Sequence, residues 1–117
     1  MAQKEIPEDW RKDVLAVLAT EDPKQVVWEP LGRTRYEADF YPDWPYEVNT
    51  SFRAFLEQAK PTGCPIQMDR PPGETWEFLF IHKTRKAYGK ILLTKDRKRI
   101  LIFSAHRPLK AKLSCES

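Results

Sequence analysis

Three stretches near the C-terminal end of the chain are rich in β-branched and aromatic residues and are joined by short, charged links. They cover residues 75–82, 88–94 and 99–105. Such residues favour strands, and short links between them favour antiparallel hairpins. The sequence therefore predicts a three-stranded antiparallel meander, which any fold of this chain has to accommodate.

Two segments ahead of the meander have helical spacing. In the first, Pro7 suits an early helical position, and an apolar stripe follows from Trp10 to Leu18. In the second, Asn49 or Thr50 can cap a helix. The apolar face of that second helix is Phe52, Phe55, Leu56 and Ala59. These spacings predict two helices.

The segment between the two helices is harder to interpret. A short strand is expected at 25–28, whereas 29–48 has three prolines and many aromatic residues and is expected to be ordered but irregular. Within it, 33–40 can be a strand or a helical turn. Pro- and Gly-containing loops are expected at 61–65 and 70–74. The order of elements predicts an α+β fold, with two helices packed on an antiparallel β-sheet that ends in the meander.

The length of 117 residues suits one domain, and 41% hydrophobic with 32% charged residues is a globular composition. No secretory signal begins the chain, and the longest apolar run, 14–19, is far shorter than the roughly 20 residues that span a bilayer. The spacing of Cys64 and Cys115 suggests neither a disulfide framework nor a metal site. We therefore expect one domain, residues 1–117, in the cytoplasm, with two free thiols and no membrane partner.

Charge is distributed unevenly along the chain. Residues 1–50 hold 11 acidic and 6 basic side chains, whereas residues 51–117 hold 6 acidic and 14 basic ones. Positions 82–112 contain 11 basic residues and a single acid, Asp96. Such asymmetry within one domain is typical of a surface that faces a polyanion, and RNA is the partner we expect. A basic face kept for solubility is the alternative interpretation.

Alternation along the strands predicts which side chains share a face. If the loop 83–87 joins the first two strands, His82 lies opposite Tyr88. If the loop 95–99 joins the next two, the same tyrosine lies opposite His106, and Lys90 lies opposite Ser104. This register gathers His82, Tyr88, Lys90, Ser104 and His106 at one end of one face. A slip of one residue would dissolve the cluster.

These side chains include the groups that phosphodiester cleavage needs. A base takes a proton from the attacking hydroxyl, an acid protonates the leaving oxygen, and cations stabilise charge on the phosphorane. Histidine titrates near physiological pH, lysine can act as base or clamp, tyrosine can stack or donate, and arginine grips phosphate through a planar fork. The predicted catalytic residues are therefore Lys90, His106, Tyr88, His82 and Arg107.

The remaining polar residues of the meander are predicted to bind RNA. They are Lys83, Arg85, Lys86, Arg97, Lys98, Arg99 and Ser104. The sequence contains no Gly-rich phosphate loop, no nucleophile-elbow motif and no zinc-binding histidine motif. We therefore expect chemistry that uses neither a metal nor another cofactor.

Three short motifs in the meander suggest a family. They are Trp76-Glu77-Phe78, Tyr88-Gly89-Lys90-Ile91 and Arg99-Ile100-Leu101-Ile102-Phe103-Ser104-Ala105-His106. They resemble the C-terminal strands of RelE-superfamily toxins, and their layout is most similar to the MqsR-like branch. By position, Tyr88 and Lys90 match the family's Tyr-x-Lys strand, whereas Ser104 and His106 match its last strand.

The resemblance implies a RelE-like domain that acts as the toxin of a bacterial toxin–antitoxin pair. Such a toxin cleaves mRNA, free or on the ribosome, without a metal. It uses the RNA 2′-hydroxyl as nucleophile and leaves a cyclic phosphate. The implied partners are RNA and a cognate antitoxin protein.

Two other functions stay open from the residues alone. The basic sheet can hold phosphates without cleaving them, as a nucleic-acid-binding module does. Alternatively, the aromatic and acidic N-terminal half can dock a protein partner. Both faces of the meander carry apolar side chains, so the sequence does not decide which face the helices cover.

Overall fold

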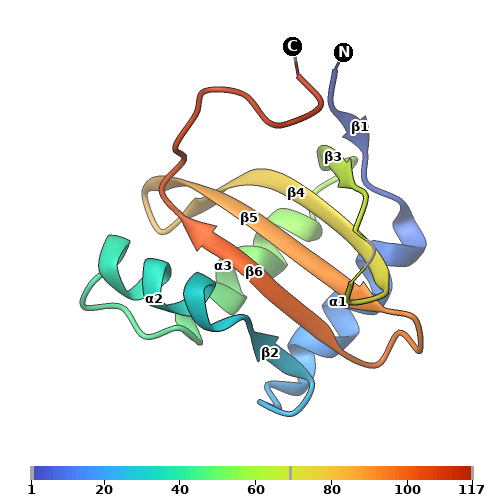
Figure 1. Ribbon diagram of the computed structural model, residues 1–117, viewed down its shortest axis with the longest axis horizontal. Helices are drawn as coiled ribbons and strands as arrows, with labels where there is room; N and C mark the ends of the chain where they lie inside the picture. Colours follow the sequence, from blue (N-terminus) through green and yellow to red (C-terminus); the bar gives the residue numbers. More distant parts are fainter. Residues whose placement is uncertain (1, 69, 117) are drawn as a thin grey trace.

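The computed structural model describes residues 2–68 and 70–116, and within them three helices and six strands form (Figure 1). The helices are α1 (Glu8–Thr20), α2 (Pro30–Asp39) and α3 (Glu47–Leu56). The strands are β1 (Lys4–Glu5), β2 (Val26–Trp28), β3 (Thr62–Ile66), β4 (Gly73–His82), β5 (Arg85–Thr94) and β6 (Ile100–His106). None of the helices in this part of the chain combines the length and the apolar character needed to cross a membrane.

The six strands form one sheet in the order β1-β3-β4-β5-β6-β2. Neighbouring strands are antiparallel except β2, which pairs parallel to β6. The predicted α+β class is confirmed, and β4, β5 and β6 pair in sequence order. The predicted layout of two helices on an antiparallel sheet is wrong in detail, because a third helix is present and the sheet is mixed.

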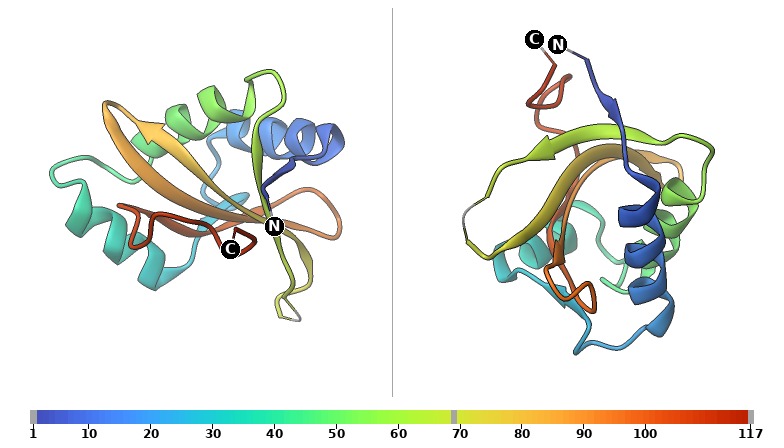
Figure 2. Two further views of the ribbon diagram at one scale, coloured as in Figure 1. Left: turned by 90° about the horizontal axis from the view of Figure 1, so that it is seen from above. Right: turned by 90° about the vertical axis from the view of Figure 1, so that its right-hand side faces the viewer.

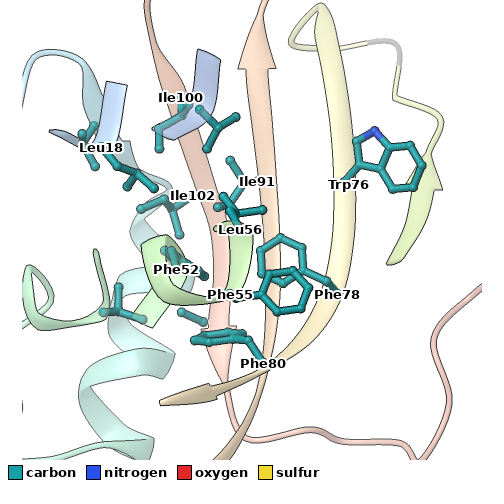
Figure 3. Close-up of a cluster of buried hydrophobic side chains, with 14 of the residues drawn as sticks. Leu18, Phe52, Phe55, Leu56, Trp76, Phe78, Phe80, Ile91, Ile100 and Ile102 are labelled. Carbon is teal, nitrogen blue, oxygen red and sulfur yellow. The ribbon is translucent and has the colours of Figure 1, made fainter. Parts of the chain in front are cut away.

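One face of β4 is apolar because every second residue is aromatic. Trp76, Phe78 and Phe80 lie on this face, and each is at most 5% exposed. Helix α3 packs Phe52 and Phe55 onto them, with the rings of Phe55 and Phe78 stacked at 4.6 Å between centroids (Figure 3). This aromatic layer is the centre of the hydrophobic core.

Helix α1 covers the same face of the sheet. Trp10, Val14 and Leu18 recur every fourth residue, form one stripe and are fully buried. The indole N–H of Trp10 donates a hydrogen bond to the carbonyl of Glu74, 2.9 Å away, at the start of β4. Figure 2 shows α1 and α3 on one side of the sheet and the C-terminal segment on the other. The face that carries Glu77 and Tyr88 is therefore left free of these two helices.

Part of the segment predicted to be irregular forms helix α2. Pro30 stands at its start, where a missing backbone N–H is not needed. The Glu29 carboxylate accepts a hydrogen bond from the N–H of Gly32 at 3.0 Å and caps the helix. Tyr36 of this helix is completely buried. A proline that suggested irregular structure thus begins a helix. This helix packs beside β6.

The two cysteines form a disulfide, and the predicted free thiols are wrong. Cys64 lies in β3, and Cys115 lies in the C-terminal segment, with 5.7 Å between their Cα atoms. The bridge joins positions 51 residues apart in sequence, so their spacing carried no signal of it. Together with the pairing of β1 and β3, it holds the two ends of the chain side by side (Figure 1).

Gly32→Ala is expected to destabilise the fold although alanine favours helices. The propensity gain is roughly 0.5–1 kcal/mol. A Cβ at position 32, however, would overlap the backbone carbonyl oxygen of Phe103 in β6. We expect a net loss of about 1–3 kcal/mol in urea unfolding, the range for overpacked interiors.

Thr34→Ala, on the exposed side of the same helix, is the matched control. It should change the free energy of unfolding by less than about 0.5 kcal/mol. A Gly32→Ala protein as stable as the wild type would contradict the close approach of α2 to β6.

Candidate active site on the open face of the sheet

The sheet face opposite α1 and α3 is hollowed into a cavity of about 750 Å³. Strands β4, β5 and β6 supply Glu77, Tyr88, Lys90, Ser104 and His106 to its wall. Helix α2 adds Arg35. The C-terminal segment closes the other side with Leu109, Lys110, Ala111, Lys112, Leu113, Ser114 and Glu116. Most of the wall is therefore polar or charged, unlike the aromatic face behind it.

Four of the predicted site residues meet in this cavity. Tyr88 pairs with His106 and Lys90 pairs with Ser104, so the predicted pairings of these two strands are confirmed. The rings of Tyr88 and His106 stack, with 5.2 Å between their centroids. The end of the β5–β6 hairpin thus places a phenol, an ammonium, a hydroxyl and an imidazole on one surface.

A bulge in β6 creates this arrangement. Ile102 pairs with Ile91 in the core, whereas the next pair along the strands joins Lys90 to Ser104, and Phe103 is the extra residue. The extra residue turns Ser104 and the residues after it onto the open face. Strict alternation, on which the predicted cluster was built, therefore does not hold through β6, because Ile102 lies in the core and Ser104 on the open face.

His82 does not join the cluster. Only Lys83 and Thr84 separate β4 from β5, instead of the predicted loop 83–87. Leu79, and not His82, lies opposite Tyr88. The observed register differs from the predicted one by three residues, and an odd difference moves a side chain to the other face of the sheet. His82 therefore lies on the face that the helices cover.

A carboxylate that the sequence analysis did not single out lies among the cavity side chains. Glu77 pairs with Lys90 across β4 and β5 and is only 4% exposed. Its Oε2 accepts a hydrogen bond from the Tyr88 hydroxyl. Its Oε1 accepts one from the backbone N–H of Ser114 at 2.8 Å and one from the hydroxyl of the same serine. These donors compensate for the cost of burying the carboxylate.

Hydrogen bonding defines the proton positions of the neighbouring groups. His106 is 5% exposed, and its Nδ1 lies 2.7 Å from the Arg107 carbonyl. A carbonyl only accepts, so Nδ1 donates to it, and Nε2 is the ring nitrogen left for other partners. Burial, together with the bond to Glu77, raises the pKa of Tyr88 well above its ordinary value. The phenol therefore stays a donor at neutral pH.

Cations surround the carboxylate and the imidazole. The amino group of Lys90 lies 5.3 Å from the centroid of the Phe103 ring, a cation–π contact that holds the side chain along the sheet. Arg35, Lys110 and Lys112 line the same cavity. This excess of positive charge attracts anions. Among residues 2–68 and 70–116, no three His, Cys, Asp or Glu side chains are grouped to hold a metal ion.

Other predicted residues lie outside the cavity wall. Arg107 is exposed just after β6, and its guanidinium lies 4.0 Å from a carboxylate oxygen of Asp39. Lys83, in the turn between β4 and β5, donates to Asp43 at 2.8 Å and to Glu47 at 3.0 Å. Both cations are therefore already paired with acids of the helical half of the chain.

The remaining basic residues occupy the two ends of the β5 hairpins. Arg85 and Lys86 are exposed at the start of β5, the end nearest His106. Lys98 and Arg99 are exposed in the turn between β5 and β6, at the opposite end. Arg97 in the same turn bonds Asp13 of α1. The structure thus separates the predicted RNA-binding residues into two groups, and their contacts with RNA stay a prediction.

His82 belongs to a second polar cluster, between α2, α3 and β4. The Tyr36 hydroxyl donates to the Trp44 carbonyl at 3.0 Å, so its oxygen accepts from Nε2 of His82 at 3.0 Å. Nδ1 is then the acceptor, and Ser51 donates to it at 2.7 Å. Asp43 lies 3.4 Å from Nε2. Burial lowers the pKa of His82 more than Asp43 raises it, so the ring is neutral at pH 7.

We expect the free energy of unfolding to fall as the pH is lowered below the ordinary histidine value of 6.5 because of His82. Its pKa in the folded chain lies below the ordinary 6.5, so the unfolded chain takes up the proton first. Its stabilising contribution is complete above pH 6.5 and is lost as the pH falls through the folded value. Thermal unfolding below this pH should show a shallower slope for His82→Gln, even if that variant is less stable at pH 7.

Titration of Asp43 does not contribute to the pH dependence that is assigned to His82. Lys83 and its hydrogen bond hold the pKa of Asp43 below its ordinary 3.8, so its contribution is lost only at lower pH. An equally steep slope in the wild type and in His82→Gln would show that another group titrates.

Comparisons with known proteins assign no family. No protein-family model matches the chain, and no curated protein and no solved structure matches it. The resemblance to RelE-superfamily toxins therefore stays a prediction, and the interpretation of the cavity rests on the chemistry of its own side chains.

Proposed function

We propose that this chain is an endoribonuclease that cleaves mRNA in the cavity on the open face of its sheet. One observation carries the proposal: a buried carboxylate, an imidazole and several cations line a single cavity of about 750 Å³. These groups are Glu77, His106, Lys90 and Arg35. A base, an acid and cations that bind phosphate are the groups that cleavage of RNA by its own 2′-hydroxyl requires.

Glu77 is the general base of the proposed reaction. Its oxygens accept protons and donate none, so one of them takes the proton of the RNA 2′-hydroxyl. The 2′-oxygen then bonds to phosphorus, and the bond from phosphorus to the 5′-oxygen breaks. His106, protonated at Nε2, gives that proton to the leaving 5′-oxygen. The products are a 2′,3′-cyclic phosphate and a 5′-hydroxyl, and proton exchange with water restores both residues.

Lys90 and Arg35 stabilise the charge that develops on the phosphorane. A guanidinium can bind two phosphate oxygens at once, and an ammonium acts as a point charge beside them. Tyr88 is a positioning residue, because its hydroxyl bonds Glu77 while its ring stacks on His106. One side chain therefore sets the distance between the base and the acid.

The resemblance of β4, β5 and β6 to RelE-superfamily toxins supports the same function. Tyr88, Lys90, Ser104 and His106 match its strand motifs, and all four line the cavity. On this basis we propose a bacterial toxin that acts in the cytoplasm on mRNA and is neutralised by a cognate antitoxin. The same chemistry needs no metal.

Two observations favour other functions. Ser114 and Tyr88 already bond Glu77, and a carboxylate so occupied is a poor base, whereas the lysines around it can still hold phosphates. This favours a non-catalytic RNA-binding module as the second candidate. Between α2 and α3, Tyr41, Trp44 and Tyr46 are 83%, 64% and 67% exposed, which favours a protein-docking surface.

The proposal predicts cleavage of single-stranded RNA by the purified protein in EDTA and dithiothreitol. Glu77→Gln and His106→Gln should each lower the single-turnover rate by about 10²–10⁴-fold, because each removes a proton-transfer group. Lys90→Ala should lower it by about 10²–10³-fold, because it removes charge stabilisation. Mass spectrometry of the fragments should find cyclic phosphate ends.

Lys12→Ala removes an exposed lysine of α1, on the other side of the sheet from the cavity, and is the matched control for charge. It should leave the rate within about threefold of the wild type, since salt screens an exposed charge so far from the cavity. Salt-sensitive RNA binding without cleavage would contradict the ribonuclease and support the RNA-binding module. Absence of RNA affinity at low salt would contradict both and support the protein-docking function.

A further inference from the structure

The C-terminal segment 107–116 crosses the open face of the sheet without forming a helix or a strand. We name it the strap. Figure 2 shows it on the opposite side of the sheet from α1 and α3. Residues of the strap and residues of the sheet line the same cavity. Glu77 is 4% exposed and bonds Ser114 of the strap, so a polynucleotide that reaches this carboxylate has to displace the strap.

Few contacts hold the strap in place. At its start the Arg107 N–H donates to Asp39 at 2.9 Å, and the other contacts come from its C-terminal half. The side chain of Leu113 is buried, with 4% of its surface exposed. The Glu116 carboxylate accepts from the Leu113 N–H at 2.9 Å and from the Gln3 amide at 3.2 Å. Ser114 bonds Glu77, and Cys115 is joined to Cys64 of β3. Of these contacts, only the Cys64–Cys115 disulfide is covalent.

The contact between the strap and Glu77 concerns the reaction directly. Ser114 donates both its N–H and its hydroxyl to the Oε1 atom. With Tyr88 on Oε2, donors occupy both oxygens of the carboxylate. Ser114 alone fills both acceptor positions of Oε1, so a 2′-hydroxyl cannot donate to this oxygen while Ser114 stays in place. The disulfide joins the very next residue, Cys115, to the strand beside β4, so it holds Ser114 at Glu77.

We propose that the strap is an autoinhibitory lid over the cavity, which the Cys64–Cys115 disulfide keeps closed and which reduction releases. This inference rests on the proposed ribonuclease function and adds its regulation. Segments held by few noncovalent contacts open locally at low cost. The disulfide fixes the far end of the strap, which is otherwise covalently attached only through β6, and so restricts the conformations open to it; loss of the bridge restores them and favours opening.

The redox step balances with a dithiol as the reductant. The dithiol donates two electrons and two protons, the S–S bond breaks, and Cys64 and Cys115 become thiols. The reductant is oxidised to its cyclic disulfide. A reducing cytosol would keep the lid free and the cavity accessible, whereas oxidation would close it, as expected of a redox-sensing disulfide.

Hydrogen exchange of the amides in 107–116 tests the lid without reference to RNA. Oxidised wild type is compared with reduced wild type and with Cys115→Ser, which lacks the bridge under any condition. We expect exchange at least tenfold faster in the two forms without the bridge. Lys110→Ala, an exposed change within the strap, is the control and should keep the difference. Equal exchange in oxidised wild type and Cys115→Ser would overturn the inference.

RNA cleavage, measured on the same samples, separates this inference from the proposed function. Cleavage at least tenfold faster in the forms without the bridge supports the lid. Equal cleavage in the oxidised and reduced protein overturns the lid and leaves the ribonuclease intact. Faster amide exchange with no cleavage in any form contradicts the ribonuclease. The exchange result would then still support release of the strap on reduction.

Discussion

The two-residue turn at Lys83–Thr84 is the constraint on which the rest of the structure depends, because it sets the register of β4 against β5. In this register the aromatic residues of β4 face the helices, and Glu77 faces the open side beside Tyr88 and Lys90. A shift of one residue would exchange the two faces. The helices would then meet a carboxylate, and the aromatic rings would meet solvent. Burial of the aromatic layer thus selects the arrangement of the polar cavity behind it.

The hydrogen bonds of the cavity combine stability with regulation. A buried carboxylate is strongly unfavourable unless donors surround it, and Glu77 has donors from Tyr88 and from Ser114. Tyr88 comes from the sheet, whereas Ser114 comes from a segment that lacks regular structure. The closed form is therefore stabilised by the same group that catalysis would need free. An RNA hydroxyl that replaces Ser114 would supply the missing donor, so opening the strap and binding substrate are coupled.

Hydrophobic periodicity was sufficient to predict that α1, α3 and the three strands form, because these elements bury regular stripes. It did not give the ends of α3, which begins at Glu47 instead of at the predicted caps Asn49 or Thr50 and ends before Ala59. The predicted pairing of Tyr88 with His106 is present, but the link length alone does not produce it. Next to the link Leu93 pairs with Ile100, one residue off the predicted register, and the bulge at Phe103 restores the predicted pairs. The turn at Lys83–Thr84 was not predictable, because it lacks the Gly or Asn residues that mark two-residue hairpins. The bulge at Phe103 has no mark in the sequence either. Glu77 was overlooked because its place opposite Lys90 follows only from the correct turn. The disulfide was missed because tertiary structure alone brings its cysteines together.

The reaction that we propose for the cavity uses a 2′-hydroxyl of RNA as the nucleophile. The most direct measurement uses Cys115→Ser protein and two oligonucleotides that differ at one position, a single ribonucleotide among deoxynucleotides and the same position with a 2′-methoxy group. We expect cleavage after the ribonucleotide alone, with a cyclic phosphate end, and no cleavage of the methoxy substrate, because a methylated 2′-oxygen has no proton to give to the base and cannot form the cyclic phosphate. Equal cleavage of the two substrates, or none of either, would contradict the proposed reaction.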